Sequence, residues 1–269
     1  MSKINTKILG ILNITPDSFS DGGKFFSIEA AIAQTISLID NGAHIIDIGA
    51  ESTRPNATLL SPLEEWNRIK DVISEIITIA HNKKVKVSID TRNAVTAYKV
   101  TQLGADYIND VSGLSDPEMI PVIKDSNANI IIMHNLGIPA DKNKVIPAHH
   151  DPIEEIIQWL KQRIEKLISA NIEANRIIID PGIGFGKTAQ QSLHIIQNIT
   201  HLKILDLPIC VGHSRKSMLS ALSINNDFRD YATTIISTFL MQKNIDFIRV
   251  HNLYLHTQTF KIWNQLLQT

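Results

Sequence analysis

Cysteine is almost missing from this chain of 269 residues, which contains only Cys210. Because Cys210 lies inside an apolar run, we expect a buried and unreactive thiol, and a single cysteine fits a reducing compartment. An excess of charge of one sign is missing too, since 26 Lys and Arg residues against 27 Asp and Glu residues leave a net charge of −1. Without a basic field, nucleic acid is not an expected partner.

Long hydrophobic runs are the third absence. No run approaches the roughly 20 apolar residues that cross a bilayer, and the first ten residues, MSKINTKILG, hold no apolar stretch of signal-peptide length. We therefore expect a cytoplasmic protein that has no membrane partner. The hydrophobic content of 43% and the charged content of 20% are ordinary for a globular domain.

Eight short β-branched runs, each ending in a polar or charged residue, alternate with stretches of helical spacing. The runs cover residues 7–13, 44–49, 85–90, 106–110, 129–134, 176–180, 208–214 and 246–251. This alternation is typical of a parallel sheet built from βαβ units. Eight repeats in a chain of this length predict a single α/β domain over residues 1–269, folded as a (β/α)8 TIM barrel.

The carboxyl ends of barrel strands share one rim, where the chemistry of such barrels lies. Asp90, Asn109 and Asp180 stand at three of these ends, and Asp110 follows Asn109. Converging acceptors suit the edge of a guanidine-like ring that carries several N–H donors. Two alternatives stay open: such an Asp is often a helix cap, or the acceptors hold a divalent metal, although no Asp-x-Asp spacing or His pair favours a metal.

Cationic residues follow the last two predicted strands. Arg249 and His251 are two residues apart and so share one strand face. Barrels often bind phosphate after these strands, so the pair suits a pyrophosphate, with an ion pair to a neighbouring Asp as the alternative. Ser214, Lys216 and Ser217 are predicted to begin a helix, whose N-terminus would provide a second position for an anion.

The run DPGIGFGKT at residues 180–188 ends in the Gly-Lys-Thr triplet of a phosphate-binding P-loop. Pro181 occupies the position where that loop requires glycine, so the P-loop interpretation fails. We interpret the run as a tight turn that brings the backbone close to a flat ligand, with Phe185 available to pack on it.

Two polar loops, at residues 13–23 and 51–55, follow the first two predicted strands. Their ordinary role is turn formation and helix capping. Because long polar loops at a barrel rim often carry function, we also predict that they close over a substrate through an ion pair between Asp21 and Arg54.

Eight sequence words occur in order: NITPDSFSDGG, ESTRP, SIDT, NDVSG, MHNLGIP, DPGIGFGKT, GHSRKS and RVHN. Together, over residues 8–266, they resemble the dihydropteroate synthases of folate biosynthesis. The resemblance implies a transferase that joins 7,8-dihydropterin-6-ylmethyl diphosphate to p-aminobenzoate, with diphosphate leaving before the amine attacks. It also implies a requirement for Mg²⁺, a homodimer and sensitivity to sulfonamides.

The resemblance assigns roles residue by residue. The pterin would be held by Asp90, Asn109, Asp180 and Lys216, and the diphosphate by Asn13, Arg249 and His251, with Asn13 also a ligand of Mg²⁺. The p-aminobenzoate would be held by Phe19, Thr53, Arg54, Pro55, Phe185 and Ser217. The residues expected to contribute to catalysis are Asp90, Lys216, Arg249, Asp21 and Arg54.

The chain departs from the family pattern without losing an assigned residue. Ala50 and Asn56 stand where glycines are expected, Asn135 and Ile138 change the wall near His134, and Asn252 replaces the usual Asp.

Three rival functions use the same fold. A methyltetrahydrofolate-binding methyltransferase domain would share the three acceptors but would not need the SRKS and RVH words. A pterin-binding protein without activity would have lost members of the cationic cluster. A sugar-phosphate isomerase or aldolase would place a Glu base or a Schiff-base Lys at a strand end, and no Glu ends a predicted strand.

Overall fold

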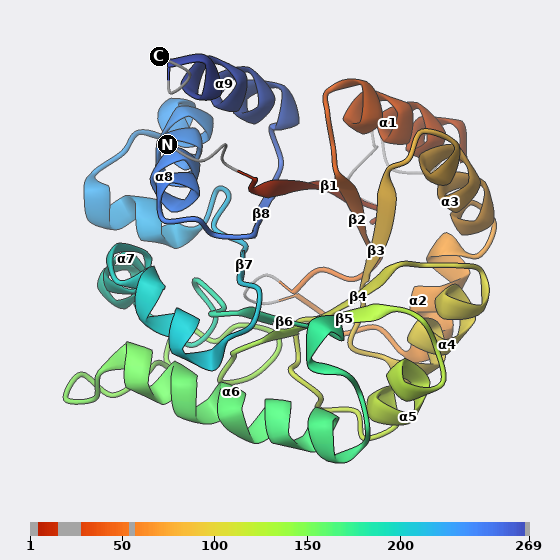
Figure 1. Cartoon of the computed structure of the whole chain (residues 1–269), viewed down its shortest axis with the longest axis horizontal. Coiled ribbons are helices and arrows are strands. Elements are labelled where there is room, and N and C mark those ends of the chain that lie inside the picture. The colour runs from red at the N-terminus through yellow and green to blue at the C-terminus, as the bar shows by residue number, and fades with distance from the viewer. Residues whose placement is uncertain (1–4, 16–27, 54–56, 267–269) are drawn as a thin grey trace.

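The computed structural model of this chain describes residues 5–15, 28–53 and 57–266 and shows a ring of strands surrounded by helices (Figure 1). The strands are β1 (Lys7–Asn13), β2 (Ile45–Gly49), β3 (Lys86–Asp90), β4 (Tyr107–Asp110), β5 (Asn129–Met133), β6 (Ile177–Asp180), β7 (Cys210–Val211) and β8 (Phe247–Val250). All pair in parallel in the order β6-β5-β4-β3-β2-β1-β8-β7. A parallel bridge between Ile179 and Ile209 joins the two ends of the sheet. The predicted (β/α)8 barrel is confirmed.

Helices follow the strands and cover the outside of the barrel. They are α1 (Ile28–Asp40), α2 (Pro62–Ile69), α3 (Ile73–Asn82), α4 (Ala94–Gln102), α5 (Met119–Lys124), α6 (Pro152–Ser169), α7 (Ala189–Gln197), α8 (Arg229–Gln242) and α9 (Leu253–Leu266). Short 3₁₀ helices lie at η1 (Ala174–Arg176), η2 (Ile199–Leu205), η3 (Ser217–Leu222) and η4 (Asn226–Phe228). None of the helices in the described ranges has the length and apolar composition needed to cross a membrane.

Local capping explains where several helices begin. Ser61 caps α2 and forms a capping box with Glu64, and Thr188 caps α7 with Gln191 in the same way. Asp151 caps α6 by accepting from the backbone N–H of Ile153 at 2.8 Å. These side chains satisfy backbone N–H groups that have no partner within the helix.

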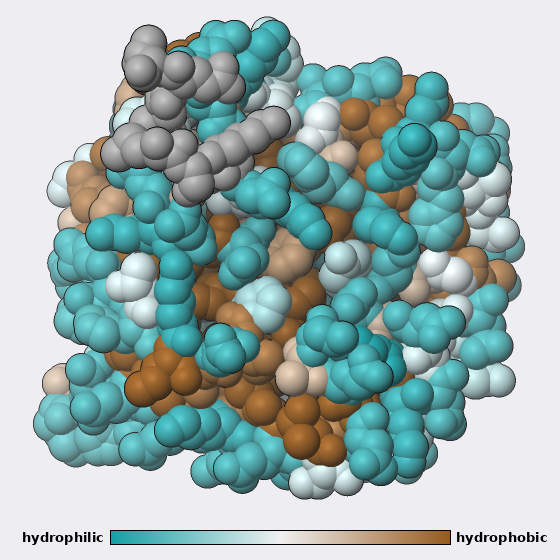
Figure 2. Space-filling view, viewed as in Figure 1, coloured by the Kyte–Doolittle hydropathy of each residue, from teal (hydrophilic) through white to brown (hydrophobic). Residues whose placement is uncertain are grey.

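The apolar residues form two cores. The larger core lies between the sheet and the surrounding helices. The smaller core fills the inside of the barrel and consists of Leu9, Ile45, Tyr107, Ile131, Ile178, Cys210 and Phe247. Cys210 is buried there, as expected, and burial raises the pKa of its thiol. Hydrophilic residues cover most of the face shown in Figure 2, with hydrophobic residues visible between them.

The segment after β7 differs from the sequence prediction. Strand β7 holds two residues rather than the seven of the predicted run, and no α-helix begins at Ser214. Arg215 has a φ of +58°, which lies outside the helical region, and η3 begins at Ser217 and has six residues. The predicted α-helix at Ser214 is therefore wrong, and the short 3₁₀ turn found there lacks the aligned dipole of a long α-helix.

Candidate active site

Polar side chains form the layer above the apolar filling of the barrel. Side chains alternate along a strand, so the residue two positions after an inward-facing residue also faces inward. Two positions after Ile45, Tyr107, Ile178 and Phe247 stand Asp47, Asn109, Asp180 and Arg249. The same alternation that builds the barrel core therefore delivers acceptors and a cation to one level near the carboxyl ends of the strands.

Arg249 lies between two carboxylates at this level. Its Nε donates to Asp47 Oδ2 at 2.5 Å, and its Nη2 donates to Asp90 Oδ2 at 2.7 Å. Asn109 donates from its amide nitrogen to Asp47 Oδ2 at 3.3 Å. The Asp47 side chain is fully buried and that of Arg249 is 20% exposed. Asp47 thus fixes the side chains of Arg249 and Asn109 through hydrogen bonds.

Asp180 and Lys216 lie beside this cluster. A Cβ atom at Gly212 would stand 3.6 Å from Asp180 Oδ2 and 3.8 Å from both Lys216 Nζ and Arg249 Cδ. The Lys216 ammonium is 4.6 Å from the centre of the Phe185 ring. The structure therefore brings together four residues that the sequence predicted for one site, and the glycine at 212 leaves room between three of them.

Asn13 and His251 complete the rim at β1 and β8. A Cβ atom at Gly49 would lie 3.7 Å from Asp90 Oδ2 and 3.9 Å from Asn13 Oδ1, so these two oxygens share one corner. His251 Nδ1 is 2.9 Å from Ser214 Oγ. This contact joins the end of β8 to the segment that leads to Lys216.

Burial dominates the electrostatics of the acceptors. It raises the pKa of Asp90 to about 7, and the negative charge of Asp47 adds to the effect while Arg249 opposes it. Burial also raises the pKa of Asp180, against the lowering effect of Lys216. For Lys216, burial lowers the pKa to about 8, although Asp180 favours the charged form. Such perturbed groups, concentrated at one place, are typical of a functional site.

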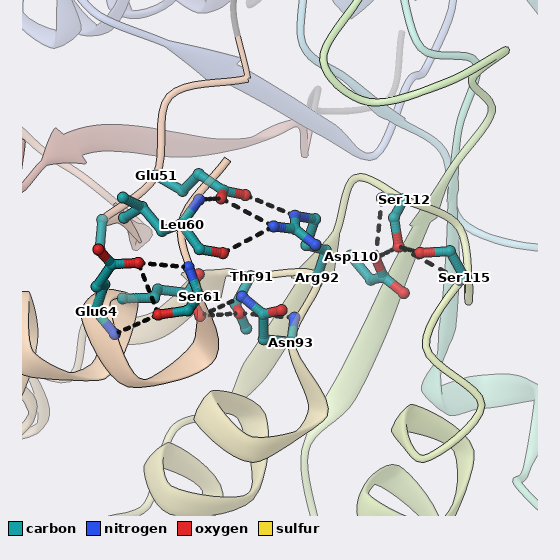
Figure 3. Close-up of polar contacts among 12 residues, drawn as sticks. Glu51, Leu60, Ser61, Glu64, Thr91, Arg92, Asn93, Asp110, Ser112 and Ser115 are labelled. Carbon is teal, nitrogen blue, oxygen red and sulfur yellow. Dashed lines mark hydrogen bonds and ion pairs between the residues drawn. The ribbon is translucent and has the colours of Figure 1, made fainter. Parts of the chain in front are cut away.

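Asp110 is separated from the acceptor cluster because it follows Asn109 directly and points to the opposite face of β4. Its carboxylate accepts from the Ser112 hydroxyl at 2.6 Å and from the backbone N–H of Ser112 at 2.9 Å (Figure 3). It also accepts from the backbone N–H of Leu114 at 2.8 Å. Asp110 is a turn-forming residue of the β4–α5 loop.

Glu51 and Arg92 fix both ends of the loop that follows β2. The Glu51 carboxylate accepts from Arg92 Nε at 2.8 Å and from the backbone N–H of Leu60, and Arg92 also donates to the carbonyl of Leu60 at 3.0 Å (Figure 3). The Glu51 side chain is 4% exposed. Thr53, which the sequence predicted for p-aminobenzoate, lies within this fastened loop and is half-buried.

Several predicted residues are not placed by the structure. Phe19, Asp21, Arg54 and Pro55 lie outside the described residues, so the predicted Asp21–Arg54 ion pair stays a prediction. Ser217 is described and exposed at the start of η3. Across residues 5–15, 28–53 and 57–266, no group of three His, Cys, Asp or Glu side chains is arranged to hold a metal ion.

Several known proteins are similar to this chain. A family model described as pterin binding enzyme matches residues 9–251. The dihydropteroate synthase of Clostridium beijerinckii is 40% identical over 262 residues, which covers 96% of this chain and 93% of that protein. A probable bifunctional folylpolyglutamate synthase/dihydropteroate synthase of Halobacterium salinarum is 39% identical over 92% of this chain, but this chain spans 30% of its length.

This chain belongs to the dihydropteroate synthase family.

Solved structures of the family agree with this assignment. The enzyme from Anaplasma phagocytophilum, with bound 6-hydroxymethylpterin-monophosphate, has a TM-score of 0.91 and 46% identity and covers 98% of this chain and 100% of its own. The enzyme from Xanthomonas albilineans with 4-aminobenzoic acid has a TM-score of 0.88 and 31% identity, covering 98% of this chain and 94% of its own. The dihydropteroate synthase assignment confirms the expected class of enzyme, a transferase.

Asp47 is a residue of this dihydropteroate synthase site that was not predicted from the sequence. The predicted acceptors stand at the ends of strands, whereas Asp47 lies inside β2 between Ile46 and Ile48. A carboxylate in the middle of an otherwise apolar barrel strand was the available signal, since a buried charge is costly unless it is paired. Here its partners are Arg249 and Asn109.

Proposed function

We propose that this chain is a dihydropteroate synthase that condenses 7,8-dihydropterin-6-ylmethyl diphosphate with p-aminobenzoate to give 7,8-dihydropteroate and diphosphate. The observation that carries the proposal is the placement of Asp90, Asn109 and Asp180 in one layer with Arg249 and Lys216. A set of acceptors beside two cations matches a substrate that joins an N–H-rich ring to an anionic tail. Relatives solved with a pterin monophosphate and with 4-aminobenzoic acid support the proposal.

The acceptors would recognise the pterin ring. Asp180 is buried and the Asp90 side chain is only 11% exposed, and such acceptors strongly favour a ligand that supplies the missing donors. The N–H groups of the pterin's guanidine-like edge are such donors. Lys216, which lies beside Asp180, would donate to an acceptor on the ring and so fix its orientation.

The reaction would proceed by departure of diphosphate before attack by the amine. A carbon attached to an electron-rich ring carries positive charge well, so the protein need not supply a nucleophile. Arg249 and His251 would stabilise the departing negative charge, and the carboxylates of Asp90 and Asp180 would stabilise the positive charge that develops on the pterin. Holding the p-aminobenzoate amine beside that carbon would lower the entropic part of the barrier to its attack.

Mg²⁺ fits the residues near the diphosphate position. The amide oxygen of Asn13 lies at the same corner as Asp90 Oδ2, and Mg²⁺ prefers oxygen ligands while keeping several waters and substrate phosphates. Asn13 would therefore hold the ion. When bound, the ion would neutralise charge on the diphosphate and make it a better leaving group.

The p-aminobenzoate would lie at the edge of the rim next to Lys216. Phe185 lies beside Lys216, and Ser217 follows Lys216 directly. Thr53 would join them from the loop after β2. The ring of Phe185 would pack on the aromatic ring, and Ser217 would receive the carboxylate. Arg54, Pro55, Phe19 and Asp21 would complete this subsite and close over it.

The test is an assay of diphosphate release with the pterin diphosphate, run with and without p-aminobenzoate and with and without Mg²⁺. Release is expected to need the ion and to yield dihydropteroate when the amine is present. Sulfamethoxazole is expected to compete with p-aminobenzoate, because the Thr53-Arg54-Pro55 segment is retained. Release that responds to neither the amine nor Mg²⁺, or turnover that resists high drug concentrations, would contradict the proposal.

We also propose that the enzyme is a homodimer that acts in the cytoplasm. Several large apolar side chains on α8 and α9 are more than half exposed, as for Tyr231 at 54%, Ile235 at 63% and Tyr254 at 61%. Exposed apolar side chains gathered on neighbouring helices are typical of protein interfaces. Sedimentation of the full chain tests the dimer.

A further inference from the structure

Lys187 is buried, although it follows a turn at the barrel rim. The residue is 5% exposed, and its Nζ lies 2.7 Å from His134 Nδ1, 2.8 Å from the carbonyl oxygen of Phe185 and 3.5 Å from the carbonyl oxygen of His134. Three polar groups thus surround the amine, and burial lowers the pKa of Lys187 well below its usual value. Each of the three is neutral in charge, so the side chain is held here by hydrogen bonds rather than by an ion pair.

His134 follows β5 and provides a fixed acceptor for Lys187. It is 2% exposed and packs edge-on against Trp159, with ring centres 5.0 Å apart. Burial, together with the neighbouring Lys187, lowers the pKa of His134 to about 2. The imidazole is therefore neutral, and Nδ1 is the ring nitrogen that faces Lys187.

The turn before Lys187 is packed tightly against the chain that leaves β5. Gly182 has a φ of +67°, and a Cβ atom there would lie 1.8 Å from the carbonyl oxygen of His134. Gly186 has a φ of +70°, and a Cβ atom there would lie 2.5 Å from the side chain of Leu136. Only glycine permits such an approach. The two ends of this turn are therefore held against the chain that leaves β5.

The carbonyl of Phe185 is the part of this turn that Lys187 holds. On the other side of the same residue, the Phe185 ring lies 4.6 Å from the ammonium of Lys216. A backbone displacement at Phe185 that breaks the hydrogen bond to Lys187 would also displace the Cα atom that carries the ring. The buried lysine and the exposed edge of the site are thus connected through one residue.

We propose that Lys187 and His134 are positioning residues for Phe185: they fix the peptide whose side chain forms the p-aminobenzoate end of the site. The inference rests on the proposed function and extends it to two residues that make no contact with substrate. It explains why the Gly-Lys-Thr triplet of this turn carries a lysine although the turn is not a P-loop. The side chain of Lys187 points into the protein and donates to backbone carbonyl groups.

The test compares Lys187→Met with Lys161→Met, which changes an exposed lysine of α6 in the same way. In Lys187→Met, the KM for p-aminobenzoate is expected to rise about tenfold, on the order of 1.4 kcal/mol. The dissociation constant of 6-hydroxymethylpterin-monophosphate, measured by calorimetry, is expected to stay within about threefold, or roughly 0.7 kcal/mol. Lys161→Met should change neither quantity.

A second pair of variants separates positioning from folding. His134→Asn keeps an acceptor for Lys187 and should retain a KM for p-aminobenzoate close to that of the unmodified chain. His134→Phe keeps the ring beside Trp159 but lacks the acceptor, so it should behave like Lys187→Met. The double variant Lys187→Met with His134→Phe replaces both polar groups by apolar ones; it should fold, because no buried side-chain donor loses its partner, yet its KM should stay raised.

The outcomes distinguish this inference from the proposed function. An active unmodified chain, together with a Lys187→Met variant that is folded and has an unchanged KM for p-aminobenzoate, would overturn the positioning role alone. Equal losses of pterin and p-aminobenzoate binding would overturn it too, because the effect would then spread over the whole site. An unmodified chain that forms no dihydropteroate would overturn the proposed function and this inference with it.

Discussion

The two ends of the barrel each hold an aspartate surrounded by hydrogen-bond donors or cations, and they differ in how well the charge is compensated. At the amino end, Asp106 accepts from Lys86 Nζ at 2.7 Å and from the backbone N–H of Val87 at 2.9 Å, and it lies 2.8 Å from His81 Nε2. At the carboxyl end, the single guanidinium of Arg249 is shared by Asp47 and Asp90.

The pKa values of the two carboxylates move in opposite directions. Burial raises the pKa of Asp106, but its hydrogen bonds from Lys86, Val87 and His81 outweigh burial and hold the pKa below its usual value. Burial raises the pKa of Asp90 to about 7, because Arg249 alone does not compensate for both burial and the charge of Asp47. The carboxylate at the amino end, Asp106, is thus compensated by its donors, whereas Asp90 at the carboxyl end has too few.

The difference shows what a ligand would contribute. An ion cluster whose members are partly in solvent, as Lys86 is at 59% exposure, supports the fold modestly and needs nothing else. A buried cluster short of donors gains stability when a ligand supplies them. The carboxyl end therefore has a reason to bind an N–H-rich ring, and the amino end does not.

The largest effect is expected from removing the shared cation. Arg249→Ala leaves the carboxylate of Asp47 buried without a charged partner, which should cost on the order of 3–5 kcal/mol of unfolding free energy. The rate of diphosphate release should fall at least tenfold, about 1.4 kcal/mol. Urea unfolding and the release assay check both. Lys216→Ala should show the fall in rate, and normal activity in both variants would place the site elsewhere.

A pH profile is expected to give the next largest effect. Because the pKa of Asp90 is about 7 in the folded chain and 3.8 when unperturbed, the folded state binds the extra proton between these values. Stability should therefore fall as pH rises from about 4 to 7, by on the order of 4 kcal/mol at most. Asp90→Asn should remove this slope from urea unfolding curves measured across that range.

The same titration is expected in catalysis. The kcat/KM for the pterin diphosphate should fall as pH drops below about 7, since protonated Asp90 accepts hydrogen bonds poorly. Asp47→Asn removes a charge that raises the pKa of Asp90, so the decline should move to lower pH. Glu118→Gln, an exposed carboxylate, serves as the control. A decline that stays in place in Asp47→Asn would show that the two carboxylates do not act together.

Much of the barrel could be predicted from the sequence because most strands are compact β-branched runs with polar residues at or near their carboxyl ends. β1 matches its predicted range fully. β7 did not follow the rule: its predicted run includes Gly212 and Ser214, and in the structure pairing stops after Val211. Glycine contributes little to a strand, so the pattern was longer than the strand it predicted.

The site was predicted where chemistry coincides with a strand end, as for Asp90, Asp180 and Arg249. It was missed where the chemistry depends on depth in the barrel. Asp47 carries no strand-end signal, and the inward direction of Lys187 follows from packing against His134, a residue 53 positions earlier in the chain. Such contacts between distant segments are set by the closed barrel and cannot be inferred from neighbouring residues alone.

The smallest effect is expected at the amino end of the barrel. Lys86→Met removes a mostly exposed partner of Asp106, so the unfolding free energy should change by about 0–1 kcal/mol and kcat/KM by less than about twofold. Asp106 keeps its hydrogen bond from Val87 and its contact with His81. Because the folded pKa of Asp106 is lowered, its contribution should be present above pH 4 and lost only below it. A large loss of activity in this variant would mean that the two ends are coupled through the barrel, and the deficit at Asp90 could then no longer be treated as local.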